Sequence, residues 1–501
     1  MRDIVVVSDL HLGRGKNPAS GRYYRLEAFF FDDDFASFCR WLCAESDAHK
    51  SDFVLVLNGD TFDLLRIEPA TEAAHTARER RFGPVMTPDV AAETVADICR
   101  GHCGFVDGVA YVLEHGHSVV MIPGNHDHEL QWAPVQAAVR DAVAEVVRKR
   151  AGEGAVARAI DALMFEPWFY YEKDRIWIEH GSQYDKENAF DFWLRGGLVD
   201  VPDTVLEAER DVPMGTFFQR YLYNAFGSIT FIVPSSRANS RYFRWLLLNR
   251  PRLLARVARS HFPFFLQVLR RIAKAGGGTT ELADVHGREL DGLAERSGLG
   301  DDLRAIDAIK TAHGNAARVA RGIIMNTLKV TILAVLLAIL VNGSWFLGVS
   351  AIDQIDAGFG LKAVLFIALN FLFLSTILGT TGYVLLRPPP APPSRPARRA
   401  AEKIAKRLDV PIVTFGHSHD EVVFRLGANN GADGWYYNTG TWVAVFTHDQ
   451  LLPRERVQYT FLRVRGTNAE LLHWSPGRGE AVPVVLLEDD RWERPPDASA
   501  S

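Results

Sequence analysis

The first residues of the sequence do not show the pattern expected of a secretory signal peptide, and the composition has no excess of polar residues. These first residues, MRDIVVVSD, lead directly into a β-branched run, without the basic stretch, apolar stretch and cleavage site of an exported chain. We therefore expect the first folding unit to start in the cytosol. Apolar residues make up 48% and charged residues 23% of the chain, which excludes disorder of the whole chain. A length of 501 residues suits two or three structural units.

Cysteine is scarce, with four residues that form two pairs of the same spacing, Cys39 with Cys43 and Cys99 with Cys103. Each pair lies on one face if its segment is helical, as the flanking apolar patterns indicate. Together the pairs are compatible with a zinc site or with a disulfide between neighbouring helices. Because cysteine is commonly buried and no export signal is present, we favour reduced thiols in the core.

Acidic residues are absent from residues 237–274, a segment that contains ten Arg or Lys. Aromatic and aliphatic residues are interleaved with these cations, as in a basic amphipathic helix on an anionic membrane surface. The same composition suits nucleic acid, although nucleic acid is not the partner that we expect, and it also suits a solvated helix face. We place the segment in a helical insert over residues 190–328.

Charged residues are absent from two longer stretches, Val330 to Ile352 and Ala363 to Leu386. Each is long enough to cross a bilayer core, and the alternative is a pair of buried core helices. We predict a transmembrane hairpin over residues 329–387, followed by a stiff, extended Pro/Arg-rich linker over 388–407. Basic residues flank the hairpin on both sides, so the prediction is a multi-pass protein of the inner cell membrane with the catalytic domain and both termini cytoplasmic.

The first part of the chain alternates strand and helix patterns. Short apolar runs end in the polar loops SDLHLG, NGDTFD and PGNHD, and a later strand pair leads to HGSQYD. In an α/β unit such loops gather at one edge of a sheet. Strand patterns resume after the linker, where VPIVTF leads into GHSHD. We expect residues 1–189 and 408–490 to form one core, with a disordered tail over 491–501.

Five polar loops supply residues suited to metal binding. Each loop alone is also typical of a turn or of a buried core histidine, but five in this order form a specific pattern. Hydrolysis of a phosphate ester needs a hydroxide-like nucleophile and positive charge near the phosphoryl oxygens, and two cations about 4 Å apart supply both. The neighbouring glycines are expected to permit sharp turns. The loops contribute, in order, Asp9 and His11; Gly59-Asp60; Gly124-Asn125-His126-Asp127; His180-Gly181; and Gly416-His417-Ser418-His419.

The metals that fit this set follow from its donors. One carboxylate must bridge the two cations, and Asp60 has the natural position for that role. Mixed Asp, His and Asn ligands suit two divalent ions such as manganese, iron, cobalt or zinc better than calcium.

This set of motifs resembles the calcineurin-like metallophosphoesterase superfamily over residues 1 to about 185 and 408 to about 475. The resemblance implies an α/β fold of two packed β-sheets flanked by helices, interrupted here by the helical insert and the hairpin. It implies a metal-bridging hydroxide as the nucleophile, with His126 stabilising the transition state or protonating the leaving oxygen and Asp127 orienting its ring. The implied ligands are Asp9, His11, Asp60 and His419 for one ion, and Asp60, Asn125, His180 and His417 for the other.

Two further motifs extend the resemblance. GDTFD, with Asp63 after Asp60, is similar to the bacterial branch that includes UDP-2,3-diacylglucosamine diphosphatases, which act on a lipid-bearing nucleotide sugar at the membrane face. The main enzymes of that branch commonly carry arginine at the position of His126 and lack a transmembrane hairpin. Asn438-Thr439-Gly440 resembles a structural turn of the superfamily, and it also reads as a plain turn between strands.

The predicted function is therefore a membrane-bound, dinuclear-metal hydrolase of phosphate ester or pyrophosphate bonds, with a lipid-linked or nucleotide-sugar substrate. The first alternative is a phosphoesterase for soluble nucleotides or phosphoproteins that the hairpin only tethers. The second alternative is a non-catalytic metal-binding scaffold, which would not need the full set of ligands and His126.

Overall fold

The computed structural model divides the chain into two compact units, one formed by Met1–Ala317 with Pro392–Ser501 and the other by Arg318–Ala391. The predicted tail over 491–501 and much of the predicted basic segment over 237–274 lie outside the described residues. The structure describes residues 2–484, except for residues 18, 69–78, 85, 195–212, 222, 227–230, 233–248, 262, 264–265, 267–279, 311–315, 387–393, 430–431 and 447–456.

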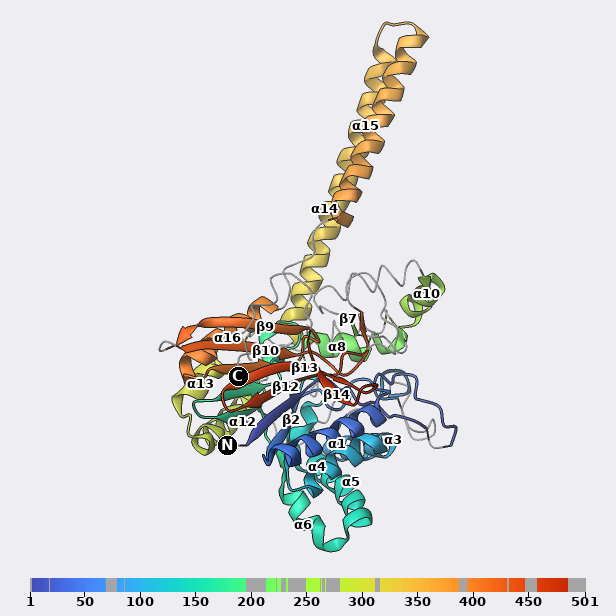
Figure 1. Ribbon diagram of the computed structural model, residues 1–501. Coiled ribbons are helices and arrows are strands. Elements are labelled where there is room, and N and C mark those ends of the chain that lie inside the picture. The colour runs from blue at the N-terminus through green and yellow to red at the C-terminus, as the bar shows by residue number, and fades with distance from the viewer. Residues whose placement is uncertain are drawn as a thin grey trace. The chain divides into compact units, whose positions relative to one another are not determined.

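The larger unit contains two stacked β-sheets (Figure 1). The first has the strand order β14-β13-β12-β1-β2-β3-β4, with β1 parallel to β2 and antiparallel to β12. Strands from the beginning and the end of the chain therefore share one sheet. Its strands are β1 (Asp3–Val7), β2 (Phe53–Asn58), β3 (Ser118–Ile122), β4 (Leu163–Phe165), β12 (Thr460–Arg465), β13 (Asn468–Ser475) and β14 (Glu480–Pro483).

The second sheet has the order β5-β6-β8-β10-β9, and it also joins distant parts of the chain, because β6 pairs with β8 in parallel. A short parallel pair joins β7 (Phe231–Ile232) to β11 (Val445–Phe446). The strands of the second sheet are β5 (Phe169–Glu172), β6 (Ile176–Glu179), β8 (Ile412–Phe415), β9 (Glu421–Asn429) and β10 (Ala432–Thr439).

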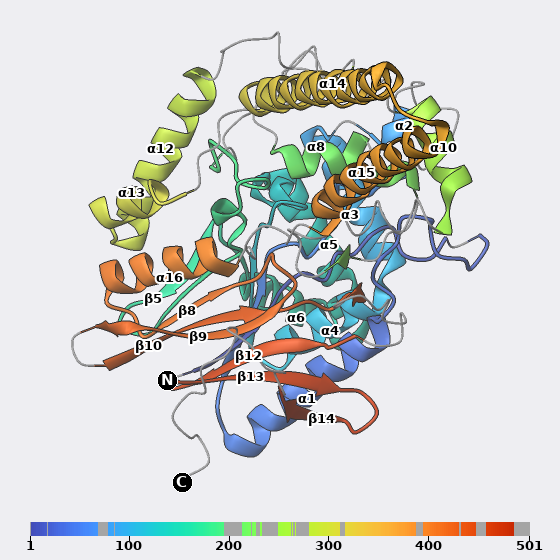
Figure 2. The same cartoon turned by 90° about the horizontal axis from the view of Figure 1, so that it is seen from above.

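Side-chain alternation along the strands builds the layers. In β1, Val5 and Val7 face a core that they share with helices on the outer side of the first sheet, whereas Ile4 and Val6 face the second sheet. Figure 2 shows these layers from above. Two mixed sheets flanked by helices fit the expected sandwich. The helices that contribute to the outer core are α1 (Asp32–His49), α3 (Pro88–Gly101), α4 (Cys103–Glu114), α5 (Ala133–Ala151) and α6 (Glu153–Asp161).

The four cysteines lie in or beside these outer helices. All four thiols are free; Cys39, Cys43 and Cys99 are buried and Cys103 is exposed. Burial raises the pKa of both Cys43 and Cys99 to about 12, which keeps these thiols protonated and unreactive.

The far side of the second sheet is covered by three helices, α12 (Thr280–Ser297), α13 (Asp301–Asp307) and α16 (Ser394–Leu408). The first two belong to the region predicted as a helical insert, and their buried Leu293 and Leu303 share a core with the second sheet. Other described elements of that region are α8 (Met214–Tyr221), η4 (Tyr223–Phe226) and α10 (Pro251–Ser260). This part of the insert is therefore integral to the larger unit.

Helix α16 corrects the prediction of an extended linker over 388–407. Its residues Ala400, Ile404 and Leu408 follow a helical spacing and are buried against the second sheet. Pro396 lies in the first turn, where a missing backbone N–H breaks no intrahelical bond. The proline-rich composition therefore marks the start of a helix rather than an extended segment through residue 407.

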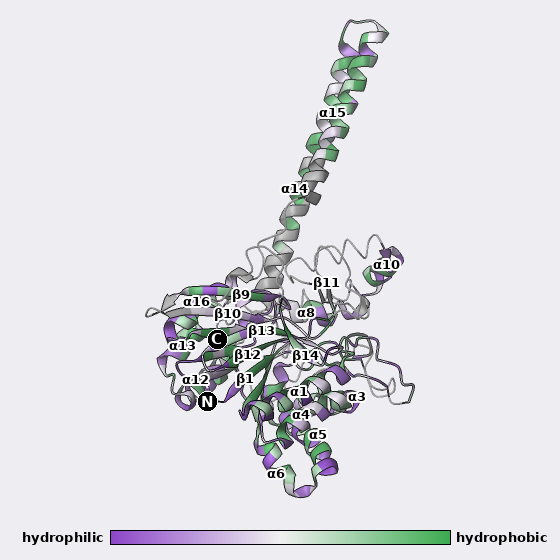
Figure 3. Cartoon of the chain, in the orientation of Figure 1, coloured by the Kyte–Doolittle hydropathy of each residue, from purple (hydrophilic) through white to green (hydrophobic). Residues whose placement is uncertain are grey.

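The smaller unit consists of two long helices, α14 (Ala316–Gln354) and α15 (Phe359–Leu386). Within the described residues, one helix is long and apolar enough to cross a membrane, over Phe359–Gly379, and it has no buried residues. Large apolar side chains such as Phe371 are exposed along it, and Figure 3 shows the hydrophobic run. The prediction of two spans is thus not confirmed, and the evidence for a membrane rests on α15.

Candidate metal centre

The five polar loops follow the ends of neighbouring strands and converge in the larger unit. Asp9 and His11 follow β1, Asp60 follows β2, and the loop from Gly124 follows β3. His180 follows β6, and the GHSHD loop follows β8 in the second sheet. Among the described residues, three overlapping groups have possible ligand atoms within 4.8 Å of one another: Asp9, His11, Asp60 and His419; Asp60, His180 and His417; and His11, Asp63 and His126.

The first group is buried and closely spaced. His419 Nε2 lies 3.1 Å from Asp9 Oδ1 and 3.0 Å from His11 Nε2. His11 Nε2 is also 3.7 Å from Asp60 Oδ2. Two imidazole nitrogens and two carboxylate oxygens thus point at one volume, although their residues lie as far apart in sequence as His11 and His419.

The second group shares Asp60 with the first. His180 Nε2 lies 3.3 Å from Asp60 Oδ2 and 3.1 Å from Asn125 Oδ1. The other ring nitrogen of His180 is 3.0 Å from the backbone oxygen of Asn58, which fixes Nδ1 as the protonated nitrogen and leaves Nε2 as the donor for a metal. The ring of His417 lies 5.3 Å from that of His180, centroid to centroid.

These atoms fit a divalent cation on structural grounds. Asp9 Oδ1 is completely buried, and its polar neighbours are the ring nitrogens of His419 at 3.1 Å and of His11 at 3.8 Å, an arrangement that suits a cation between them. The facing nitrogens of His11 and His419 cannot both carry a proton at 3.0 Å, so at least one presents a lone pair. Burial also lowers the pKa of His11 to about 4, which keeps its ring neutral and able to ligate.

The backbone is strained at the same positions. Nine non-glycine residues among those that the structure describes have a positive φ, and five of them are candidate ligands. Each such residue costs of the order of 1–3 kcal/mol, so strain concentrates where the side chains converge. The five are Asp9, His11, Asp60, His417 and His419.

Two of the glycines beside the site allow neighbouring loops to pack closely and do not form tight turns. A Cβ on Gly124 would lie 2.1 Å from Asp60 Oδ1, and one on Gly416 would lie 2.5 Å from Asp9 Oδ2. Neither glycine has a positive φ, unlike Gly59 and Gly181. The expectation of sharp turns therefore applies to two glycines, whereas the other two allow neighbouring loops to approach closely.

The contact that orients His126 differs from the expected one. Asp63 Oδ1 lies 2.9 Å from His126 Nδ1, whereas the carboxylate of Asp127 accepts backbone N–H groups from Gly124, Asp60, Thr61 and Phe62. Asp127 therefore ties the second and third loops together, and the prediction that it orients the His126 ring is corrected in favour of Asp63. Burial alone would lower the pKa of His126, but Asp63 and Asp60 raise it above its ordinary value.

Sequence reasoning also missed Asp185, the last residue of HGSQYD. Its Oδ2 lies 3.1 Å from His417 Nε2, and its side chain is mostly buried. Burial alone would raise the pKa of Asp185, but His417 and nearby donors hold it at about 2. Its position after a histidine motif at a strand end was the available signal.

The Asn438-Thr439-Gly440 turn connects the first and last loops. Asn438 Nδ2 donates to the oxygen of Gly416, and Thr439 Oγ1 lies 2.6 Å from Ser8 Oγ. The next residue, Thr441, donates to the oxygen of Asp9 at 2.6 Å. The turn thus supports two ligand-bearing loops, which is more than a plain connection between strands would do.

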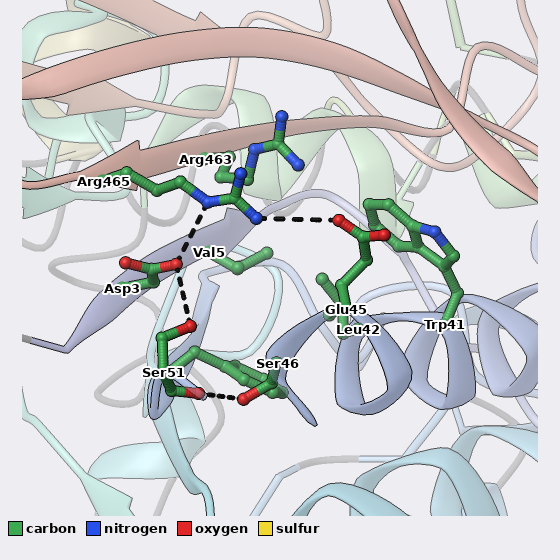
Figure 4. Close-up of a pocket in the computed structure, with 10 residues that line it drawn as sticks. Asp3, Val5, Trp41, Leu42, Glu45, Ser46, Ser51, Arg463 and Arg465 are labelled. Carbon is green, nitrogen blue, oxygen red and sulfur yellow. Dashed lines mark hydrogen bonds and ion pairs between the residues drawn. The ribbon is translucent and has the colours of Figure 1, made fainter. Parts of the chain in front are cut away.

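One surface hollow lies beside the candidate metal centre, and a second lies away from it. One of about 360 Å³ opens beside His417 and is lined in part by Tyr184, Asp185, Ser418 and Asn438. The other lies at the opposite end of β1, where Arg465 pairs with Asp3 and Glu45 (Figure 4). The other arginine that lines this hollow, Arg463, pairs with Glu470, so carboxylates already match both arginines and neither is set up to bind a phosphate.

Comparison with known proteins supports the geometry. Residues 2–228 match the model of the calcineurin-like phosphoesterase family. The match includes the loops with Asp9, Asp60, His126 and His180 but ends before the GHSHD loop, which the fold brings to the same place. The search of curated proteins finds no match for this chain. Over residues 2–228, the chain is thus similar to the calcineurin-like phosphoesterase family, as its motifs predicted.

Proposed function

We propose that the protein hydrolyses phosphate ester or phosphoanhydride bonds at a centre of two divalent metal ions. The observation that carries the proposal is the convergence of two groups of acidic and imidazole side chains that share Asp60. A shared carboxylate is what a pair of ions about 4 Å apart requires. The family match over residues 2–228 supports a metal-dependent phosphoesterase, and the choice of bond is part of the proposal.

We assign Asp9, His11, Asp60 and His419 to one ion and Asp60, Asn125, His180 and His417 to the other. Bound divalent ions would supply positive charge to the phosphoryl oxygens and lower the pKa of water. The chain itself holds the ligands in place: Asp127 joins two of the loops through its four backbone contacts, and Asn58 fixes the tautomer of His180.

His126 is the proton donor in this proposal. Its Nδ1 contacts Asp63, and we assign Nε2 as the nitrogen that donates to a leaving oxygen. The raised pKa of His126 favours the protonated ring, which is the form that donates. The ring also packs edge-on against His11 at 4.6 Å between centroids, so the proton donor lies directly beside the first group.

We further propose that α14 and α15 form a membrane hairpin with both flanks cytoplasmic, and that the substrate is lipid-linked or a nucleotide sugar. Support comes from the apolar run of α15, in which no residue is buried, and from the basic flanks of both helices. The exposed Arg252, Arg256 and Arg259 of α10 add positive charge to the larger unit.

The metal-dependent activity is tested with the full-length protein in detergent, supplied with Mn²⁺ and p-nitrophenyl phosphate esters. Asp60→Asn and His417→Ala should each lower kcat at least about 100-fold, and a chelator should abolish turnover until metal is returned. His49→Ala changes an exposed histidine on α1 and serves as the matched control. Undiminished turnover by Asp60→Asn would refute the assignment.

Substrate class needs a separate comparison. A panel should include a lipid-linked nucleotide sugar and a soluble nucleotide with the same pyrophosphate group. A higher kcat/KM for the lipid-linked compound supports the membrane-bound function, whereas equal values favour a phosphoesterase that the hairpin only tethers. Metal binding without turnover of any compound would instead indicate a scaffold.

A further inference from the structure

The α8–η4 segment of the insert is bonded at both ends to loops that support the candidate metal centre. At its start, the backbone N–H of Gly215 donates to the oxygen of Glu187 at 2.7 Å. At its end, Asn224 Nδ2 donates to the oxygen of Leu65 at 2.8 Å. Glu187 lies two residues after Asp185, and Leu65 lies two residues after Asp63. The segment therefore contacts the loop that carries Asp185 and the loop that carries Asp63.

The first attachment fixes the turn that holds His417. Asp185 Oδ1 accepts the backbone N–H of Glu187 at 3.0 Å, and Asp185 Oδ2 accepts Asn188 Nδ2 at 2.8 Å. The same Oδ2 lies 3.1 Å from His417 Nε2. A carboxylate held by two donors in this way can accept the Nε2 proton of His417, which leaves Nδ1 for a metal.

Helix α8 fits tightly against this turn. A Cβ on Gly215 would lie 2.1 Å from Asn188 Oδ1 and 3.1 Å from the oxygen of Glu187. Any larger residue would therefore have to displace Asn188, which is one of the two donors to Asp185. The contact couples the position of α8 to the orientation of the carboxylate.

The second attachment supports the proton donor. Leu64, next to Leu65, donates its backbone N–H to the oxygen of His126 at 3.1 Å, and Asp63 contacts the His126 ring. Asn224 is buried, and its own Oδ1 accepts Gln219 Nε2 at 2.9 Å, which fixes the amide so that Nδ2 faces Leu65.

We propose that the α8–η4 segment holds both flanks of the reaction centre, with Asp185 as the positioning residue for His417 and Asn224 as the positioning residue for the loop of Asp63 and His126. The inference rests on the proposed function, since it assigns a ligand role to His417 and proton donation to His126. It adds that a segment of the insert completes the site.

The first test measures Mn²⁺ affinity by calorimetry on the full-length protein. Asp185→Asn should weaken Mn²⁺ binding about 10–100-fold, because the ring of His417 loses its charged acceptor. Gly215→Ala should weaken it in the same direction without changing Asp185. Asp307→Asn is the control, because Asp307 of α13 pairs with His286 of α12 and with Lys310 and not with a candidate ligand. Wild-type affinity in both site variants would overturn the role of Asp185.

The second test separates positioning of His126 from a general loss of stability. Asn224→Ala should lower kcat about 10-fold or more for phenyl phosphate but much less for p-nitrophenyl phosphate, whose leaving group needs little protonation. Its Mn²⁺ affinity should stay unchanged. Gln136→Ala is the control, since that amide also donates to a backbone oxygen, that of Leu130. Equal losses on both esters, or a parallel loss of affinity, would overturn the role of Asn224.

The two proposals fail in different ways. If the wild-type protein binds Mn²⁺ but hydrolyses no ester, the proposed function fails, while the affinities of Asp185→Asn and Gly215→Ala still decide the role of Asp185. If wild-type turnover is metal-dependent and these variants bind Mn²⁺ normally, only the further inference fails.

Discussion

At the scale of residues, the convergence of the polar loops was predictable from the chain, whereas the contacts of individual side chains within them were not. The type and order of Asp9, Asp60 and His180 predicted that their side chains lie close together, and they do so in the fold. That prediction gave Asp127 the orienting role that Asp63 has in the fold, because chain proximity suggested that Asp127 reaches the ring next to it. In the fold, Asp127 turns back toward backbone N–H groups, and the ring of His126 points across the loop to Asp63.

A buried ion cluster behind the first loop makes stability depend on pH. Glu27 is almost inaccessible and accepts the N–H groups of Gly13 and Gly15, two to four residues after His11. His102 lies 3.3 Å from Glu27 and 3.0 Å from Asp32. Burial alone would lower the pKa of His102, but the two carboxylates raise it to about 9. The cluster therefore fixes the first loop through a charged histidine.

The resulting stability should be present at pH 6 and lost as the pH rises through about 9, because the folded pKa of His102 exceeds its unfolded value of about 6.5. The difference between the folded and unfolded pKa of His102 corresponds to a stabilisation on the order of 3 kcal/mol. His102→Gln should flatten this decline in urea unfolding free energies between pH 6.5 and 9. His49→Gln, at an exposed site, should not. A decline that persists in His102→Gln would contradict the assignment.

At the scale of elements, the positions of apolar residues along the chain predicted helices and strands better than the composition of a segment did. The short apolar runs in β1 and β2, each followed by a polar loop, predicted strands that the structure has, because a central strand of a covered sheet is buried on both faces. The α16 region was misjudged because its prolines and arginines dominate its composition. Its buried Ala400, Ile404 and Leu408 show that four-residue spacing outweighs composition once a sheet is available to pack against.

Helix α16 can be distinguished from a linker by two single substitutions. Ile404→Ala removes a fully buried side chain and should cost about 2–5 kcal/mol in free energy of unfolding. Lys403→Ala, one residue earlier on the exposed face, should change stability by less than about 0.5 kcal/mol. Both values come from urea titration of the full-length protein in detergent. If neither substitution matters, residues 394–408 do not dock as a helix.

At the scale of the whole molecule, both sheets combine strands that come before the smaller unit in the sequence with strands that come after it. Strand β1 pairs with β12, and β6 pairs with β8, so neither sheet is complete before the chain returns at Pro392. This arrangement was predictable from the order of the motifs, since GHSHD needed partners from the first half. The insert's contacts with the site were not, because Asn224 and Gly215 carry no motif.

The same arrangement predicts that the smaller unit is dispensable for chemistry. All candidate ligands, His126 and the α8–η4 segment belong to the larger unit. Replacing residues 318–391 by a flexible Gly/Ser linker should therefore preserve Mn²⁺ affinity and turnover of p-nitrophenyl phosphate within about twofold. The extra loop entropy is small, because each doubling of loop length costs about 0.6 kcal/mol.

The deletion variant should also lose vesicle binding, which flotation with phosphatidylglycerol-containing vesicles measures, because the exposed apolar run of α15 is removed. Turnover of a lipid-linked substrate in vesicles should then fall much more than turnover of the soluble ester. A matched variant that keeps α14 and α15 but carries the same linker in place of residues 387–393 controls for the linker itself. If the deletion variant is inactive on the soluble ester while this control is active, the smaller unit contributes to the site. In that case, the prediction that it is dispensable for hydrolysis is wrong.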